Sequence, residues 1–234
     1  GFGTVIASGA NTAGVGQTTD DFSMGSAIIL SRSGDEWMAT AKVMGEAPDP
    51  LPALTGEDVR CDDELADQFP CENVDIRSFL PVSAIGGGRG AETNDVWGWT
   101  DPEANREIAI VGRTDGTAFI DVTNPNRPVY LGNLPKTPGS RANAWRDIKV
   151  YRNHAYIVAD GALEHGMQVF DLTRLRAVTD TPQTFTPDAT YREIFSAHNV
   201  VADTASKHLY VVGANSGGQT CGGGLHMVDA TNPL

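Results

Sequence analysis

The chain has 234 residues, 40% hydrophobic and 20% charged, so it can bury a sizeable core and has the composition of a globular protein. Its formal net charge of −13 opposes binding to nucleic acid and to anionic membrane surfaces, and no apolar run approaches the roughly 20 residues of a membrane span. The 26 glycines and 13 prolines indicate many turns between short strands.

Residues 1–45 contain four short apolar segments separated by turn-rich sequence. The segments are residues 2–7, 13–17, 26–31 and 37–43. Four antiparallel strands in about 40 residues is the size of one propeller blade. We therefore predict a blade-sized unit at the N-terminus.

Residues 46–90 are rich in Pro, Asp, Glu and Gly, and we interpret them as an insertion on the rim. Their apolar part, residues 78–85 (SFLPVSAI), predicts one outer strand. Cys61 and Cys71 bracket the acidic loop CDDELADQFPC. This spacing favours a local disulfide, which would require an oxidising compartment; two reduced thiols are the alternative.

From residue 91 to residue 234 one unit recurs. The first copy predicts strands at 95–100, 107–112, 117–122 and 128–134. The second predicts strands at 146–151, 155–159 and 167–172, with a fourth within 185–194, and the third predicts strands at 198–202, 209–213 and 225–229. Asp95, Asp147 and Asn199 mark the first strands at equal intervals of 52 residues (147 − 95 and 199 − 147). The predicted fold is all-β, a β-propeller of four-stranded antiparallel blades that is incomplete in this chain, because the third copy lacks a fourth strand.

In a propeller the first strand of each blade lines the central channel, and the starts of these strands converge at one mouth. The residues predicted to meet there are Asn94, Asp95, Arg146, Asp147, His198 and Asn199. Such a cluster suits a divalent cation such as calcium, with Asp95, Asp147 and His198 as ligands, or a small polar ligand. The alternative is a polar plug in which Asp and Asn cap the strand starts.

The recurring Asp-x-Thr of the third strands, with Asp121, Asp171 and Asp229, predicts a turn in which the carboxylate accepts backbone hydrogen bonds. Trp97 and Trp99 alternate on one strand, so both face the same side, either to pack between blades or to stack on a ligand. We expect Trp145 to pack between blades. Motifs such as HExxH, GxSxG or a phosphate-binding loop do not occur, so the sequence carries no catalytic signature.

Many short segments fall in the order seen in one family. They include NDVWGWTDP, REIAIVGRTDGTAFIDVTNPNRPVYLGNLP, WRDIKVYRNHAYIVAD, HGMQVFDLTRLR, SAHNVV and CGGGLHMVD. From about Cys71 onward the chain resembles the bacterial choice-of-anchor B proteins, which contain LVIVD-type β-propeller repeats, and residues 1–45 are more weakly similar to FG-GAP repeats. The resemblance implies export to the cell surface and no established catalytic activity. It also implies that Cys221 pairs with a Cys outside this chain.

These observations predict an extracellular or cell-surface β-propeller that acts as a binding or scaffold module, as a fragment or subunit of a larger protein or assembly. The expected partners are other protein chains or surface glycans. The alternative is a metal-dependent, hydrolase-like enzyme with its site at the channel mouth.

Overall fold

A computed structural model describes residues 2–17, 20, 24–45, 51–215 and 223–233. The described chain is all-β, with antiparallel sheets and two short 3₁₀ helices, and none of the sheets closes on itself. No helix among the described residues is long and apolar enough to cross a membrane. The chain divides into two compact units, Gly1–Pro50 with Gly88–Ala91, and Leu51–Gly87 with Glu92–Leu234.

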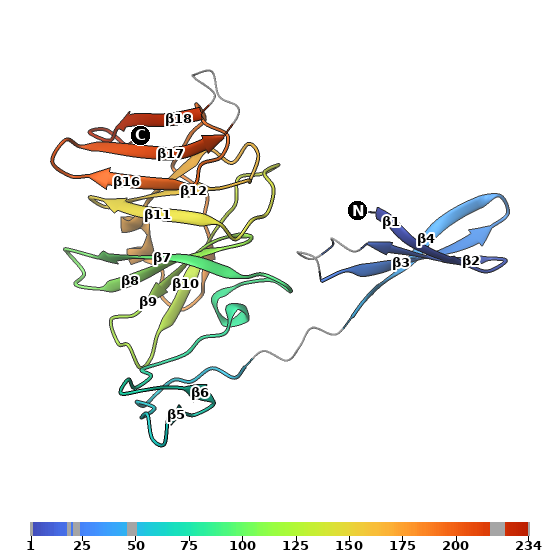
Figure 1. The fold of residues 1–234 in the computed structure, drawn as a ribbon, viewed down its shortest axis with the longest axis horizontal. Coiled ribbons are helices and arrows are strands. Elements are labelled where there is room, and N and C mark those ends of the chain that lie inside the picture. Colours follow the sequence, from blue (N-terminus) through green and yellow to red (C-terminus); the bar gives the residue numbers. More distant parts are fainter. Residues whose placement is uncertain (1, 18–19, 21–23, 46–50, 216–222, 234) are drawn as a thin grey trace. The chain divides into compact units, whose positions relative to one another are not determined.

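The first unit is one antiparallel sheet, sheet 1, in which each strand pairs with the next (Figure 1). Its strands are β1 (Phe2–Ser8), β2 (Thr12–Gln17), β3 (Ser26–Ser33) and β4 (Glu36–Met44). The four strands predicted from the N-terminal sequence are confirmed. Ala13 and Val15 of β2 are buried, whereas every residue of β4 is exposed.

The second unit begins with a loop segment closed by the predicted disulfide. Cys61 and Cys71 are bonded, with an S–S distance of 1.99 Å and 5.9 Å between their Cα atoms. They enclose a small hairpin of β5 (Leu65–Ala66) and β6 (Phe69–Pro70). Cys221 lies outside the described residues.

The outer strand predicted at residues 78–85 is wrong, because this segment ends in a 3₁₀ helix, η1 (Val82–Ile85). Pro81 has no N–H to donate to a strand ladder, and Gly86 ends the helix in the left-handed region with φ 81°. Leu80 and Ile85 instead pack against Ala118 and Ile120. The apolar segment therefore covers the face of a sheet without extending its edge.

Three further sheets form the rest of the second unit. Sheet 2 consists of β7 (Thr93–Thr100), β8 (Glu107–Arg113), β9 (Gly116–Asp121), β10 (Val129–Pro135) and β14 (Gln183–Thr184). Sheet 3 consists of β11 (Arg146–Tyr151), β12 (His154–Ala159), β13 (Met167–Asp171) and β15 (Ala189–Tyr191). Sheet 4 consists of β16 (Asn199–Asp203), β17 (His208–Asn215) and β18 (Gly223–Asp229).

Sheets 2, 3 and 4 are stacked face to face in chain order (Figure 1). The first strand of the middle sheet, β11, contacts both β7 and β16. Because side chains alternate along a strand, each sheet can bury both faces. In β12, for example, Ile157 belongs to the core shared with sheet 2, whereas Tyr156 and Val158 belong to the core shared with sheet 4.

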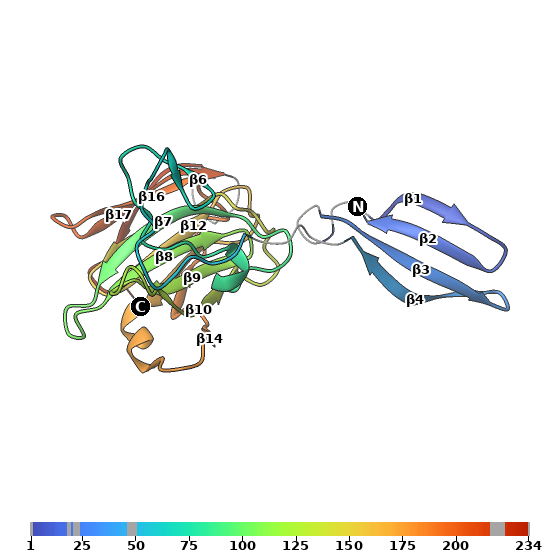
Figure 2. The same ribbon diagram turned by 90° about the horizontal axis from the view of Figure 1, so that it is seen from below.

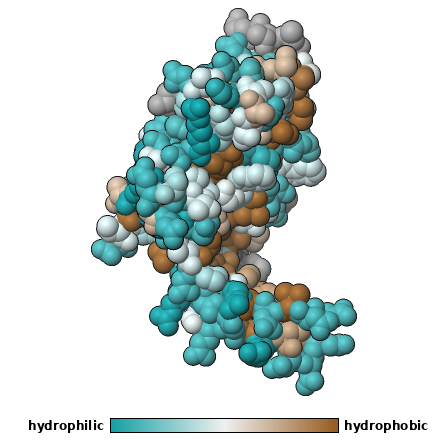
Figure 3. All heavy atoms as spheres, turned by 90° about the vertical axis from the view of Figure 1, so that its left-hand side faces the viewer, coloured by the Kyte–Doolittle hydropathy of each residue, from teal (hydrophilic) through white to brown (hydrophobic). Residues whose placement is uncertain are grey.

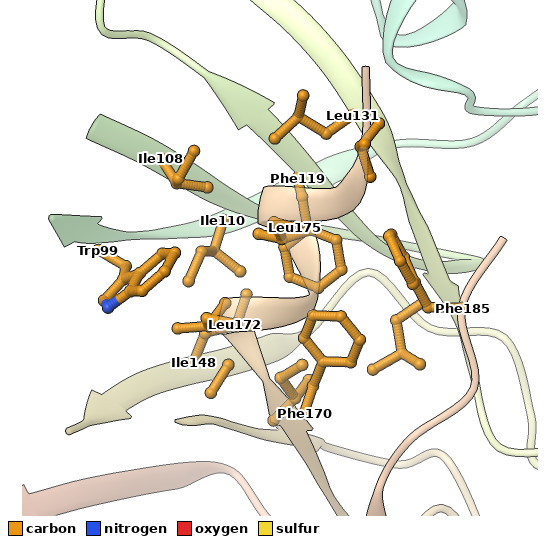
Figure 4. Close-up of a cluster of buried hydrophobic side chains, with 14 residues drawn as sticks. Trp99, Ile108, Ile110, Phe119, Leu131, Ile148, Phe170, Leu172, Leu175 and Phe185 are labelled. Carbon is orange, nitrogen blue, oxygen red and sulfur yellow. The ribbon is translucent and has the colours of Figure 1, made fainter. Parts of the chain in front are cut away.

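The core between sheets 2 and 3 is rich in aromatic side chains (Figure 4). Phe119 of β9 stacks on Phe170 of β13 with ring centroids 4.7 Å apart, and Phe185 packs against both. Leu172 and Leu175 come from η2 (Leu172–Ala177), the 3₁₀ helix that follows β13. A segment that lies outside the strands of sheet 3 thus fills the space between two sheets.

Phe185 reaches this core because β14 runs parallel to β10 at the outer edge of sheet 2 (Figure 2). Gly132 of β10 permits this approach. Its φ is 141°, and a Cβ atom there would lie 2.0 Å from the carbonyl oxygen of Gln183. Only glycine fits both the conformation and the space.

The turn after each third strand is built as its Asp-x-Thr sequence predicted. The Oδ1 atoms of Asp121, Asp171 and Asp229 each accept a hydrogen bond from the backbone N–H two residues later, at 2.9, 2.9 and 2.8 Å. The same turn recurs in all three sheets, which confirms that these aspartates shape the backbone.

Candidate functional site

Two of the predicted channel-mouth residues link neighbouring sheets. Asp95 Oδ2 in β7 accepts a hydrogen bond of 2.8 Å from the N–H of Ile148 in β11, and Asp147 Oδ2 accepts one of 2.7 Å from the N–H of Val200 in β16. In both cases the donor lies 53 residues after the acceptor (148 − 95 and 200 − 147). In both cases, a carboxylate on the first strand of one sheet therefore bonds to the backbone of the first strand of the next sheet.

The structure brings Asp95 and Asp147 close together beside Lys149. The Lys149 ammonium pairs with Asp147 Oδ1 at 2.5 Å and lies 4.4 Å from the centre of the Trp97 ring. Burial raises the pKa of Asp95, the Asp147 carboxylate raises it further, and the Ile148 N–H and Lys149 act in the opposite direction. The Lys149 ammonium thus lies close to both carboxylates.

Arg146 does not line this space, because adjacent residues of a strand point to opposite faces. Its side chain is buried, with Nε donating to the carbonyl of Arg113 at 2.5 Å and Nη1 donating to Nε2 of His165 at 2.9 Å. A guanidinium has only donors, so His165 must accept at Nε2, and its proton sits on Nδ1, 3.0 Å from the carbonyl of Gly166. Burial, together with the charge of Arg146, lowers the pKa of His165 to about 3.

His198 is paired with the carboxylate of Asp160, the residue that follows β12 of sheet 3. Its Nδ1 lies 2.9 Å from Oδ2 of Asp160, and the His198 side chain is 48% exposed. The Trp145 ring lies 5.9 Å from the His198 ring and is tilted by 46°. Trp145 is 60% exposed, so the prediction that it packs between blades is wrong.

The two remaining predicted residues, Asn94 and Asn199, are both exposed. Within the described parts of the chain, no group of three or more His, Cys, Asp or Glu side chains is placed to hold a metal ion. The proposed ligands Asp95, Asp147 and His198 instead bond to backbone, Lys149 and Asp160.

A pocket of about 470 Å³ opens among three loops, two of which adjoin Asp160 and His198 in the chain. Its lining consists of Pro138, Gly139, Arg141, Gly161, Leu163, Glu164, Phe195 and Ser196. Gly161 directly follows Asp160, and Ser196 lies two residues before His198. The pocket and the exposed Trp145–His198 pair thus belong to the same loop end of the stacked sheets.

The loops around this pocket are held together by hydrogen bonds between them. The N–H of Arg141 donates to the carbonyl of Ala162 at 2.9 Å, and Thr137 Oγ1 donates to the carbonyl of His165 at 2.7 Å. Leu163 has a positive φ of 57° and is 52% exposed. A bulky residue rarely adopts this conformation, and such strain is concentrated at functional sites.

Sequence reasoning missed this pocket, because its residues come from three loops and form no motif. Only the Gly and Pro content of those loops marks them as turns. The chain matches no model of a known protein family and no curated protein. The geometry of the site is therefore the basis on which a function can be assigned.

Proposed function

We propose that this chain is a binding module of an exported, β-propeller-type protein similar to the choice-of-anchor B proteins. Support comes from the three stacked antiparallel sheets, whose first strands are linked at equal spacing by Asp95 and Asp147. The Cys61–Cys71 disulfide fits an oxidising compartment outside the cell. In this proposal sheets 2, 3 and 4 are consecutive blades.

The ligand site is the surface formed by Trp145, the His198–Asp160 pair and the adjoining 470 Å³ pocket. The observation that carries this proposal is the 60% exposure of Trp145 beside polar side chains. An exposed indole offers a flat apolar surface for a sugar ring, while neighbouring polar groups bond to its hydroxyls. Arg141 and Glu164 in the pocket supply such groups, so we propose a surface glycan as the ligand.

The test measures glycan binding by the whole chain, first on a glycan array and then by calorimetry with a glycan that binds on the array. Trp145→Ala should weaken binding about tenfold or more, since the indole supplies most of the stacking area. Trp37→Ala is the matched control, because Trp37 is also exposed, at 43%, but lies in sheet 1. Equal losses in both variants, or no glycan binding at all, would refute the proposal.

A further inference from the structure

One histidine at the proposed glycan site is oriented by a carboxylate. Nδ1 of His198 lies 2.9 Å from Oδ2 of Asp160, and the His198 side chain is 48% exposed. The other carboxylate oxygen, Oδ1, accepts a hydrogen bond of 2.7 Å from the N–H of Gly161. Because a carboxylate has only acceptors, the proton of the neutral imidazole lies on Nδ1, and Nε2 keeps its lone pair. Nε2 is therefore the basic atom of this pair.

The backbone on both sides of the pair is fixed by hydrogen bonds. Asp160 follows β12, and its N–H donates to the carbonyl of Trp145 at 2.8 Å, while its carbonyl accepts from Nδ2 of Asn143 at 2.7 Å. His198 precedes β16, and its N–H donates to the carbonyl of Val212 at 3.1 Å. The base and its carboxylate thus stand at the ends of strands in two packed sheets, which holds a catalytic pair in place better than free loops would.

The pair lies beside a surface that can hold a substrate. The ring centre of Trp145, which is 60% exposed, lies 5.9 Å from that of His198. Apolar side chains reach the surface elsewhere too, among hydrophilic ones (Figure 3), so exposure alone does not distinguish this site. What distinguishes it is an exposed indole next to an accessible basic nitrogen. A sugar stacked on the indole would therefore present its substituents to His198.

The groups at this site favour one class of reaction. A single general base with access to water can catalyse hydrolysis of an acyl group, whereas glycoside hydrolysis usually requires two carboxylic groups that flank the bond. The net charge of −13 opposes anionic substrates such as phosphate esters. A neutral carboxylic ester on a sugar satisfies both conditions.

We propose that the His198–Asp160 pair hydrolyses O-acyl esters, such as acetyl esters, on the glycan that Trp145 holds. Nε2 of His198 takes a proton from a water molecule while the water oxygen bonds to the acyl carbon. The bond between that carbon and the sugar oxygen then breaks, and the proton passes from Nε2 to the sugar oxygen. The products are a carboxylic acid and the free sugar hydroxyl. Asp160 is a positioning residue that orients the imidazole and stabilises its transient charge.

This inference rests on the proposed glycan site for its substrate. The assay measures acetate release from glucose pentaacetate by the whole chain in a pH-stat, with 4-nitrophenyl acetate as a second substrate that carries no sugar. His198→Gln should lower kcat about 100-fold or more, the usual contribution of a positioned general base. Asp160→Asn should lower kcat about tenfold or more and leave KM unchanged, because Trp145 holds the substrate.

His208→Gln is the matched control. His208 is also partly exposed, but its Nδ1 faces the backbone carbonyl of Ser206 at 2.7 Å instead of a carboxylate. This variant should keep the rate of the parent chain. Added imidazole should restore part of the rate to His198→Ala, after subtraction of the rate with imidazole alone, which a purely structural role of His198 would not allow. Thermal melts show whether each variant is folded.

Three results would overturn the proposal: no acetate release above that of the heat-denatured chain, equal rates for His198→Gln and the parent chain, or equal losses for His198→Gln and His208→Gln. If glycans bind but no ester is hydrolysed, the proposed glycan site stands and this inference is wrong. If 4-nitrophenyl acetate is hydrolysed in a manner that depends on His198 but no glycan binds, the catalytic pair stands and the sugar substrate is wrong. Failure of the glycan site and failure of the catalytic pair are therefore separate outcomes.

Discussion

Replacing Asp147 with alanine should destabilise the unit that holds sheets 2–4 by about 1–3 kcal/mol. Asp147 is 5% exposed, and its Oδ2 satisfies the N–H of Val200, which is fully buried. The variant leaves that buried donor without a partner, which accounts for most of the cost. It also removes the carboxylate that pairs with Lys149, although the loss of its repulsion toward Asp95 offsets part of the effect.

The assay is urea unfolding followed by tryptophan fluorescence and circular dichroism. Asp147→Asn is the control, because its amide oxygen can still accept from the Val200 N–H while the charge is lost. We expect Asp147→Asn to cost less than Asp147→Ala, because the hydrogen bond from the Val200 N–H is kept and only the ion pair with Lys149 is lost. Equal losses in both variants would show that the ion pair with Lys149 matters more than the link to sheet 4. A loss below about 0.5 kcal/mol in the alanine variant would refute the link between the sheets as a source of stability.

Further predictions concern pH and packing. Because the pKa of His165 in the fold is about 3, the unfolded chain binds more protons below pH 6.5, so stability should fall by up to about 1.4 kcal/mol per unit as pH drops from 6.5 toward 3. His165→Gln should flatten that slope in denaturant titrations at several pH values. The hydrogen bond from Arg176 lowers the pKa of Asp101 in the folded chain. The ionised Asp101 therefore stabilises the fold above its unfolded pKa of about 3.8, and this stability is lost as the pH falls. Asp101→Asn should lower Tm at pH 7, and the Tm values of the variant and the parent chain should converge in acid. Gly132→Ala should lower the unfolding free energy by more than about 1 kcal/mol, whereas Gly98→Ala, in open space, should change it little, and equal thermal melts would contradict this.

Local patterns in the sequence predicted most of the strands and the Cys61–Cys71 disulfide. Alternating apolar residues and turn signals placed most strands of the four larger sheets, because these signals act between neighbours in the chain, but they did not place β14. The Cys61–Cys71 pair followed from ten residues of separation. The apolar run at 78–85 gave a wrong strand, since Ile85 is buried and Leu80 partly buried by packing on Ala118 and Ile120, and this packing needs no strand ladder.

The site was predicted less well, because its parts meet only through the stacking of sheets. The interval between Asp95 and Asp147 identified the first strands, yet gave no sign that each carboxylate bonds to the backbone of the next sheet. The side chains of adjacent strand residues point to opposite faces of the sheet. Arg146 therefore pairs with buried His165, while Asp147 faces sheet 4. The pocket beside Trp145 combines three loops that the sequence marks only as turns.

By itself, the sequence determined that this protein is built of short antiparallel strands in a repeated unit, with Asp-x-Thr turns and one disulfide. These features depend on hydrogen bonds and side-chain periodicity within a few residues of one another. Only the tertiary structure decided which face each side chain presents to the next sheet, where Phe185 enters the core, and which loops line the 470 Å³ pocket. Those outcomes depend on packing between segments about 50 residues apart, which no local pattern specifies.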